Sequence, residues 1–334
     1  MDVRDKPTVH GAAGSMNKVY EVRAGFRSGG RVTWPTGGLG VVTRCWRVLA
    51  LSARDPRRPG VLCSNWGVEE FRELLSRHVG STAIDGMRIC RTGRATAPER
   101  GMSGTALAIV ADGKKRLGLG EQLYDYGPGQ YLVTSVDLPV MGHATGPALA
   151  FGMTLDPREI AKLVTEGPRE PKPGTAVSEA GTELLDAVVR LLRLLDRPRD
   201  REALAPLYKR EILWRLLTGE QGDRLRQISA PDRITRAVGW IRQNYPRRFK
   251  VAELAQRAGV SVPTFHRDFR TVTAMSPIQF QKHIRLQSAR LMLANPGQDV
   301  TSVGYEVGYD SPSQFSREYR RVFGATPSQD RASR

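Results

Sequence analysis

The sequence contains no apolar run long enough to cross a membrane, and it has only three cysteines and five histidines. A membrane-spanning helix needs about 20 consecutive apolar residues, and no segment of the 334 residues approaches that length. The first residues, MDVRDKP, include no apolar stretch typical of a secretory signal. Cys45, Cys63 and Cys90 show no metal-ligand spacing, and three cysteines cannot all pair in disulfides, which favours a reducing compartment. We therefore expect a cytoplasmic protein with no membrane partner.

The residue clusters of a catalytic site are also scarce. The middle of the chain contains only two histidines, His78 and His143, and Glu121 stands alone among the short apolar segments around it. A catalytic metal would need several clustered His and carboxylate ligands. The sequence shows no Ser/His/Asp or Cys/His arrangement. We expect no catalytic residues, no metal and no cofactor, and we interpret His143 as a structural residue.

Positive charge is concentrated at the two ends of the chain, whose formal net charge is +17. Residues 230–334 contain 17 Lys and Arg against 8 Asp and Glu, and residues 1–65 contain 11 against 4. Residues 66–229 are nearly neutral, with 23 against 22. A basic domain of this size indicates a polyanionic partner, although charge alone would also suit an anionic membrane surface.

The texture of the sequence changes near Trp66. Residues 1–65 are rich in Gly and Arg without periodicity, so we expect them to be disordered, and a native start downstream of Met1 is an open alternative. After a helix predicted over 68–79, short apolar segments separated by turn signals predict a small β-barrel or sandwich. The pair Asp112-Gly113 predicts a hairpin between two of its strands.

A second group of helices follows a connection that is rich in proline and glycine. Asp156 and Pro157 are typical of the start of a helix, and residues 166–177 (EGPREPKPGTAV) read as a link between modules. Residues 182–218 then predict two helices that are apolar on more than one face. Such helices need partners on two sides, either the β domain or a second subunit, and the two arrangements can coexist.

The C-terminal part contains an internal repeat. SVPTFHRDFRTVTAMSP begins at Ser261, and SPSQFSREYRRVFGATP begins at Ser311. At this offset six residues are identical, and an acidic residue is shared in kind at Asp268 and Glu318. The identical pairs are Ser261/Ser311, Phe265/Phe315, Arg267/Arg317, Arg270/Arg320, Val272/Val322 and Pro277/Pro327. Two copies are too few for a solenoid, so we interpret them as a pair of equivalent motifs.

Each copy predicts a helix-turn-helix. In the first, Gly259 ends a helix, Ser261 caps the next one, and Phe265, Phe269 and Val272 share its buried face. The second copy has Gly308, a cap at Ser311, and an inward face of Phe315, Tyr319 and Val322. The aromatic spacing indicates core packing rather than base stacking. The intervening segment, PIQFQKHIRLQSARLMLAN, predicts a helix of about 27 Å that could hold both units against successive major grooves.

These residues resemble the AraC/XylS family of transcription regulators. VGYDSPSQFSREYRRVFGATP is close to the C-terminal signature of the family, and the resemblance covers about residues 230–328. Residues 68–165 are similar, less tightly, to the cupin-like N-terminal domain of one branch, through TAIDGMRICR and GQYLVTSVDLPV, and REILWRLLTGEQGDRLRQI resembles the family's linker. The resemblance implies an α+β multidomain fold. We expect a cupin-like β-barrel over 66–175, a helical linker or dimerisation segment over 176–229, and an all-α domain with two helix-turn-helix motifs over 230–330.

The resemblance also implies roles for outward residues of the two repeated helices. The residues expected to contact bases are Pro263, His266, Arg267, Ser313, Ser316 and Arg317. Pro263 has no side-chain donor, which leaves apolar contact with a thymine methyl. Arg270 and Arg320 are expected to contact phosphates, which position a protein without specifying sequence. His266 could instead contact a phosphate or be polar surface.

We therefore expect a sequence-specific regulator of transcription, not an enzyme, that binds double-stranded DNA. The expected partners are a small effector held in the barrel, a second copy of the chain and RNA polymerase. Cys90 could sense oxidants, although a small buried apolar side chain is the favoured interpretation. The alternatives are a non-specific architectural DNA binder and a cupin-type enzyme with an accessory DNA-binding domain.

Overall fold

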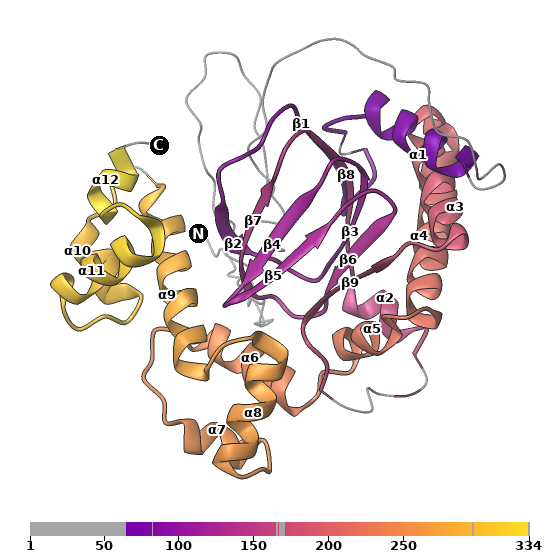
Figure 1. Ribbon diagram of the computed structural model, residues 1–334. Coiled ribbons are helices and arrows are strands. Elements are labelled where there is room, and N and C mark those ends of the chain that lie inside the picture. The colour runs from indigo at the N-terminus through magenta and orange to yellow at the C-terminus, as the bar shows by residue number, and fades with distance from the viewer. Residues whose placement is uncertain (1–64, 82, 165, 167–170, 296, 333–334) are drawn as a thin grey trace, which may run out of the picture. The chain divides into compact units, whose positions relative to one another are not determined.

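Short apolar segments over residues 87–179 form nine strands in the computed structural model, which describes residues 65–81, 83–164, 166, 171–295 and 297–332 (Figure 1). The disorder expected for residues 1–65 lies outside these residues except at Asn65. The strands are β1 Met87–Thr92, β2 Glu99–Met102, β3 Ala106–Asp112, β4 Lys115–Leu119, β5 Gln122–Tyr126, β6 Gln130–Thr134, β7 Pro139–Ala144, β8 Ala148–Thr154 and β9 Thr175–Glu179.

The strands pair in two sheets, with the orders β1-β8-β3-β6-β9 and β2-β7-β4-β5, and every ladder is antiparallel. The five-stranded sheet is buried on both faces. On β3, Leu107 and Ile109 pack toward one core and Val110 toward another. Burial of both faces explains why this strand is an apolar run rather than an alternating one. The predicted cupin-like arrangement of β-strands is confirmed.

The predicted hairpin at Asp112-Gly113 is wrong. β3 pairs with β6 and β8, whereas β4 pairs with β5 and β7, so the turn carries the chain from one sheet to the other. The local signal is correct, because Gly113 adopts a φ of 75° and donates its N–H to Asp112 Oδ1. Local turn chemistry sets the reversal of the chain, but burial on both sheet faces decides which strands become neighbours.

Part of the predicted connection at 166–177 is also a strand. β9 begins at Thr175 and pairs with β6, placing Val177 opposite Leu132 and Glu179 opposite Gln130. The Gln130 amide donates to Glu179 across the ladder at 2.7 Å. The prolines before β9 favour a connection in the sequence, but a short strand follows them, and its pairing with β6 sets its register.

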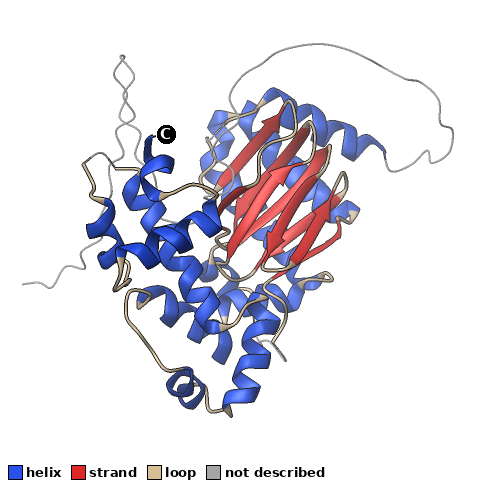
Figure 2. Ribbon diagram, turned by 60° about the vertical axis from the view of Figure 1, so that its left-hand side comes forward, coloured by secondary structure: helices blue, strands red, loops and turns tan. Residues whose placement is uncertain are grey.

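Helices cover one face of the five-stranded sheet (Figure 2). The cap predicted at Asp156 is confirmed, since its side chain accepts the N–H of Arg158 at 2.8 Å. Val188, Leu191 and Leu192 of α3 are fully buried against the sheet and its neighbouring helices. The helices of this region are α1 Asn65–Arg77, α2 Pro157–Ala161, α3 Thr182–Arg193, the 3-10 helix η1 Leu194–Asp196, α4 Pro198–Thr218 and α5 Gly222–Ser229.

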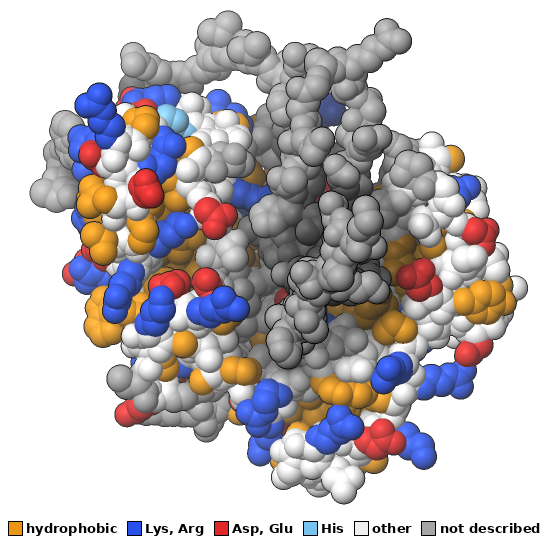
Figure 3. Space-filling model, turned by 180° about the vertical axis from the view of Figure 1, so that it is seen from behind, with side chains coloured by type: hydrophobic (Ala, Val, Ile, Leu, Met, Phe, Trp, Pro, Cys, Tyr) orange, Lys and Arg blue, Asp and Glu red, His pale blue; other side chains and the backbone are white. Residues whose placement is uncertain are grey.

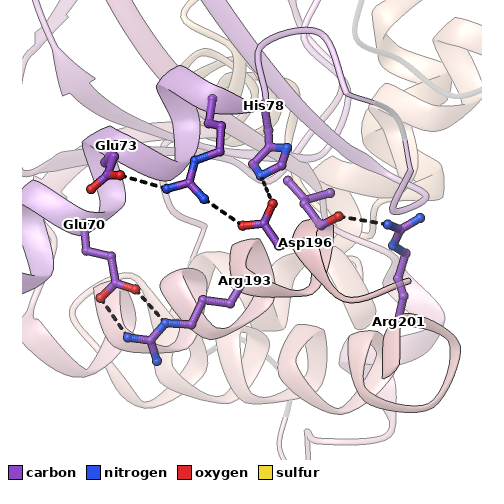
Figure 4. Close-up of polar contacts among 8 residues, drawn as sticks. Glu70, Glu73, His78, Arg193, Asp196 and Arg201 are labelled. Atoms are coloured by element: carbon purple, nitrogen blue, oxygen red, sulfur yellow. Dashed lines mark hydrogen bonds and ion pairs between the residues drawn. The ribbon is translucent and has the colours of Figure 1, made fainter. Parts of the chain in front are cut away.

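Ion pairs join α1 to the end of α3 (Figure 4). Arg193 donates twice to Glu70, at 2.6 and 2.7 Å, and Arg77 bridges Glu73 and Asp196. These side chains line a hollow of about 520 Å³ on the protein surface. On the face drawn in Figure 3, basic and acidic side chains are interspersed. These charged side chains pair with one another and connect the two helices. The hollow that they line is therefore not suited to an apolar ligand.

From Arg233 onward, the residues that the structure describes form helices joined by turns, and no strand. The helices are α6 Arg233–Gln243, α7 Val251–Arg257, α8 Val262–Thr273, α9 Pro277–Leu293, α10 Val300–Glu306, α11 Pro312–Phe323 and α12 Pro327–Ala332. One hydrophobic core combines residues of α6 to α9 with residues of both sheets, and α9 packs on β2 and β7. The backbone N–H of Gly174 donates to Val272 O at 2.9 Å in this region. No helix in the part of the chain that the structure describes is long and apolar enough to cross a membrane.

The packing of α9 on β2 predicts a dependence of stability on pH. Burial, assisted by the charges of Arg100 and Lys282, lowers the pKa of His283 from 6.5 to about 4. The unfolded chain takes up this proton near pH 6.5 and the folded protein only near pH 4. The free energy of unfolding should therefore have its full value above about pH 6.5. It should fall by up to about 3 kcal/mol as the pH approaches 4.

Urea unfolding at a series of pH values tests this expectation. His283→Gln should show a smaller fall over that interval than the parent protein. Equal slopes for the parent and His283→Gln would contradict the assignment.

Candidate nucleic-acid interface

The first repeat folds as two helices joined by a tight turn. α7 ends before Gly259, which adopts a φ of 68°, a conformation that glycine tolerates best. Ser261 then caps α8, because its hydroxyl accepts the N–H of Thr264 at 3.3 Å. Ala274 ends α8 in the left-handed conformation and donates its N–H to Arg270 O. The capping predicted for this copy is confirmed.

The inner face of α8 is aromatic. Phe265, Phe269 and Val272 have no exposed surface, and the two phenylalanine rings lie 5.7 Å apart. Phe280 of α9 meets Phe269 edge to face at 5.7 Å. The rings are core residues, as their spacing predicts, and they fix which side of α8 faces away from the protein.

The second repeat has the same design. Gly308 has a φ of 95°, and Ser311 caps α11 by accepting the N–H of Gln314 at 3.4 Å. Phe315 and Tyr319 are fully buried with rings 5.6 Å apart, while Val322 is half-buried. The two copies therefore share both their cap and their buried aromatic pair.

α9 connects the copies as one uninterrupted helix of 17 residues, about 25 Å long at 1.5 Å per residue. It begins with a capping box in which Ser276 and Gln279 satisfy each other's backbone N–H groups. Gln281 and Arg285 donate to the carbonyl of Tyr245, at 2.9 and 2.7 Å, just beyond the end of α6. These bonds hold the connecting helix to the segment between α6 and α7.

The residues expected to contact DNA lie on the faces of α8 and α11 opposite the aromatic rings. Every one is exposed except Ser316, which is half-buried. Each helix thus presents its own set of exposed residues, in which one arginine precedes a second arginine by about one helical turn. The exposed residues are Pro263, His266, Arg267 and Arg270 on α8, and Ser313, Arg317 and Arg320 on α11.

Arg267 is held by Asp268, an acid for which the sequence predicted no role in binding. Its Nε donates to Asp268 Oδ1 at 3.2 Å, although its side chain is 73% exposed. Asp268 is itself 8% exposed, and its other oxygen accepts from Arg233 of α6 at 3.2 Å. The repeat carried a signal for this group, because an acid follows the arginine in both copies.

The corresponding acid of the second copy has different partners. Glu318 accepts the hydroxyl of Tyr309 at 2.9 Å and lies 3.2 Å from Lys282 of α9. Burial, together with the Glu318 carboxylate, raises the pKa of Tyr309 well above its usual value, so the phenol stays a donor. Arg317 has no ion pair or side-chain hydrogen bond within the described residues.

His143, Cys90 and Glu121 lie on separate elements of the β domain. His143 lies on β7, and Cys90 lies half-buried on β1. Glu121 is 95% exposed at the turn after β4 and lies 4.0 Å from Arg270. Among the residues that the structure describes, no three His, Cys, Asp or Glu side chains converge as a metal site would require.

Two family models match the chain. The first describes the N-terminus of AraC-type transcriptional regulators and matches residues 83–224. The second describes a helix-turn-helix domain and matches residues 254–333. Between them they cover the two sheets, helices α2 to α4 and both repeated helices, whereas α1 lies outside the matched ranges.

Individual relatives match over part of their length. The chain is similar to the transcriptional regulator ArgR of Pseudomonas aeruginosa, with 30% identity over 43% of this chain and 45% of that protein. The regulator ExsA of the same organism is 30% identical over 48% of this chain and 59% of its own length. The match thus spans about half the length of these relatives. A crystal structure of ToxT from Vibrio cholerae aligns over 74% of this chain and 97% of its own, with a TM-score of 0.48 and 7% identity.

The two turn glycines provide a matched test of the interface geometry. A Cβ at Gly308 would lie 2.2 Å from Pro246 O, whereas a Cβ at Gly259 would meet nothing within 4 Å. Both positions have positive φ. Gly259→Ala should cost about 1 kcal/mol of stability for its backbone conformation, and Gly308→Ala more than about 2 kcal/mol because the backbone must also move. Thermal unfolding monitored by circular dichroism measures both, and equal losses would show that the turns are equally open.

Proposed function

Because the chain belongs to the AraC-type transcriptional regulators, we propose that it binds specific sites on double-stranded DNA and regulates transcription there. The observation that carries this proposal is the pair of serine-capped helices. Each buries an aromatic pair on one side and presents two exposed arginines on the other. A helix of this kind, preceded by a short helix and a tight turn, is the element that enters the major groove.

We assign direct base contacts to Arg267 and Arg317, the equivalent arginines of the two copies. Arginine reads guanine through two parallel hydrogen bonds to O6 and N7. His266, Ser313 and Ser316 are assigned to bases beside them, and Pro263 to a thymine methyl. Arg270 and Arg320, one turn further along each helix, are assigned to phosphates.

The proposed division of labour along the chain follows the predicted modules. Residues 230–330 bind DNA, residues 66–175 bind a small effector, and residues 176–229 couple two subunits. Support for the last comes from α4, where Leu207 is 59% exposed and Trp214 is 47% exposed, seven residues apart on one side of the helix. A helix that buries one apolar side within its own chain and exposes another suits a homodimer interface. RNA polymerase is the further partner that an activator would contact.

An architectural DNA binder with the same fold is the competing function. Footprinting separates the two, because a regulator protects one defined site whereas an architectural protein protects none preferentially. Metal analysis of the purified protein addresses the less favoured enzyme, since stoichiometric iron, manganese or zinc would support catalysis in the β domain.

Selection of bound duplexes from a random pool, followed by binding measurements on the selected site, tests the proposal. Arg267→Ala and Arg317→Ala should each cost about 1–3 kcal/mol on that site and relax the preference at one base pair. Arg270→Ala should weaken binding to every sequence alike and reduce the slope of log K against log salt by about one unit. The proposal fails if the pool yields no preferred sequence. The assignment of roles fails if both classes of variant lose affinity equally on all duplexes.

A further inference from the structure

We propose that Asp268 is a positioning residue, which orients the guanidinium of Arg267 for one base pair and makes the first helix-turn-helix the more stringent reader. The inference rests on the proposed function, because it requires Arg267 to contact a base. It concerns a residue that is buried behind the DNA-facing surface and does not touch DNA itself.

The geometry ties the exposed arginine to the core of the domain. Asp268 follows Arg267 on α8 but is only 8% exposed, and one of its oxygens accepts from Arg267 Nε at 3.2 Å. The other oxygen accepts from Arg233, the first residue of α6, also at 3.2 Å. The carboxylate is therefore held from a second helix, and it in turn holds the arginine.

The chemistry of the guanidinium makes this contact useful for recognition. An arginine has five N–H donors in one plane, and a bond at Nε leaves the two terminal nitrogens for a ligand. Those nitrogens form the fork that matches O6 and N7 of guanine. A long, exposed side chain that is already oriented loses less conformational freedom on binding, so its preference for the matching base is sharper.

The second copy shows that this arrangement is a property of one motif and not of both. Glu318 occupies the position equivalent to Asp268, but its oxygens are engaged by Tyr309 and Lys282. Arg317 is not paired within the described residues. Its side chain is therefore free to adjust to different bases. We expect the half-site under α8 to tolerate fewer substitutions at the arginine's base pair than the half-site under α11.

Asp268→Asn is the most direct test, because it keeps the shape and one carbonyl oxygen but removes the charge. The Arg267→Ala variant first identifies the base pair that Arg267 reads. It is the base pair whose replacement in the duplex weakens binding by the parent protein but not by the variant. Competition binding with duplexes changed at that pair should then show that Asp268→Asn lowers discrimination there by about fivefold or more, and leaves other base pairs unaffected. In the double variant Asp268→Asn/Arg267→Ala, discrimination should fall no further than in Arg267→Ala alone.

Glu318→Gln is the matched control in the second copy. It removes the charge at the equivalent position, and discrimination at the base pair read by Arg317 should stay within about twofold of the parent's. A purely structural role of Asp268 would lower affinity for all duplexes by one factor, and that result would overturn the proposal. If Arg267→Ala itself leaves every preference unchanged, the proposed base reader is wrong instead.

A second variant keeps the test decisive if Asp268→Asn does not fold. Arg233→Gln leaves the carboxylate in place but removes the partner that holds it from α6. Discrimination at the same base pair should again fall, by a smaller factor, while the dependence of binding on salt stays that of the parent. Unchanged discrimination in a folded Arg233→Gln protein would overturn the proposal.

Discussion

The burial of two aromatic side chains, one helical turn apart, sets the geometry of each repeated helix. Phe265 and Phe269 have no exposed surface, and neither do Phe315 and Tyr319. A helix that must hide this face has no freedom to rotate about its axis, so the opposite face is fixed as well. The position of every arginine proposed to touch DNA follows from that rotation. The serine caps fix where each helix begins, and therefore which residues stand nearest its N-terminal end.

The connecting helix α9 joins the two helix-turn-helix motifs into one structural unit. α9 contributes Phe280 to the aromatic core of the first copy and Lys282 to the carboxylate of the second. The capping box at Ser276 fixes where α9 begins. The side chain of Gln281 donates to the backbone carbonyl of Tyr245, just beyond the end of α6. Since one continuous helix packs on both copies, their separation is set by its length and not by a flexible linker. DNA with its regular groove spacing is the ligand that such a fixed separation suits.

The C-terminal helices could be predicted from the sequence because their information is local: caps, glycine turns and aromatic spacing all lie within about a dozen residues. The β domain was predicted less completely. Asp112-Gly113 predicted the turn correctly but not the strands that pair beside it, and the prolines before β9 gave no sign of a strand. Both errors have one cause, because burial between segments distant in the chain decides which strands become neighbours. Asp268 was missed for a similar reason. Its neighbour Arg267 is adjacent in sequence, but Arg233, which gives the carboxylate its second bond, lies 35 residues earlier.

Guanine methylation interference on the selected duplex tests the central claim that both helices meet one face of DNA. Methylation of N7 blocks the major-groove edge that an arginine reads. The account predicts two clusters of interfering guanines, about one helical turn or 10 base pairs apart, on the same side of the duplex. A single cluster, or two clusters separated by half a turn and so on opposite sides, would contradict it.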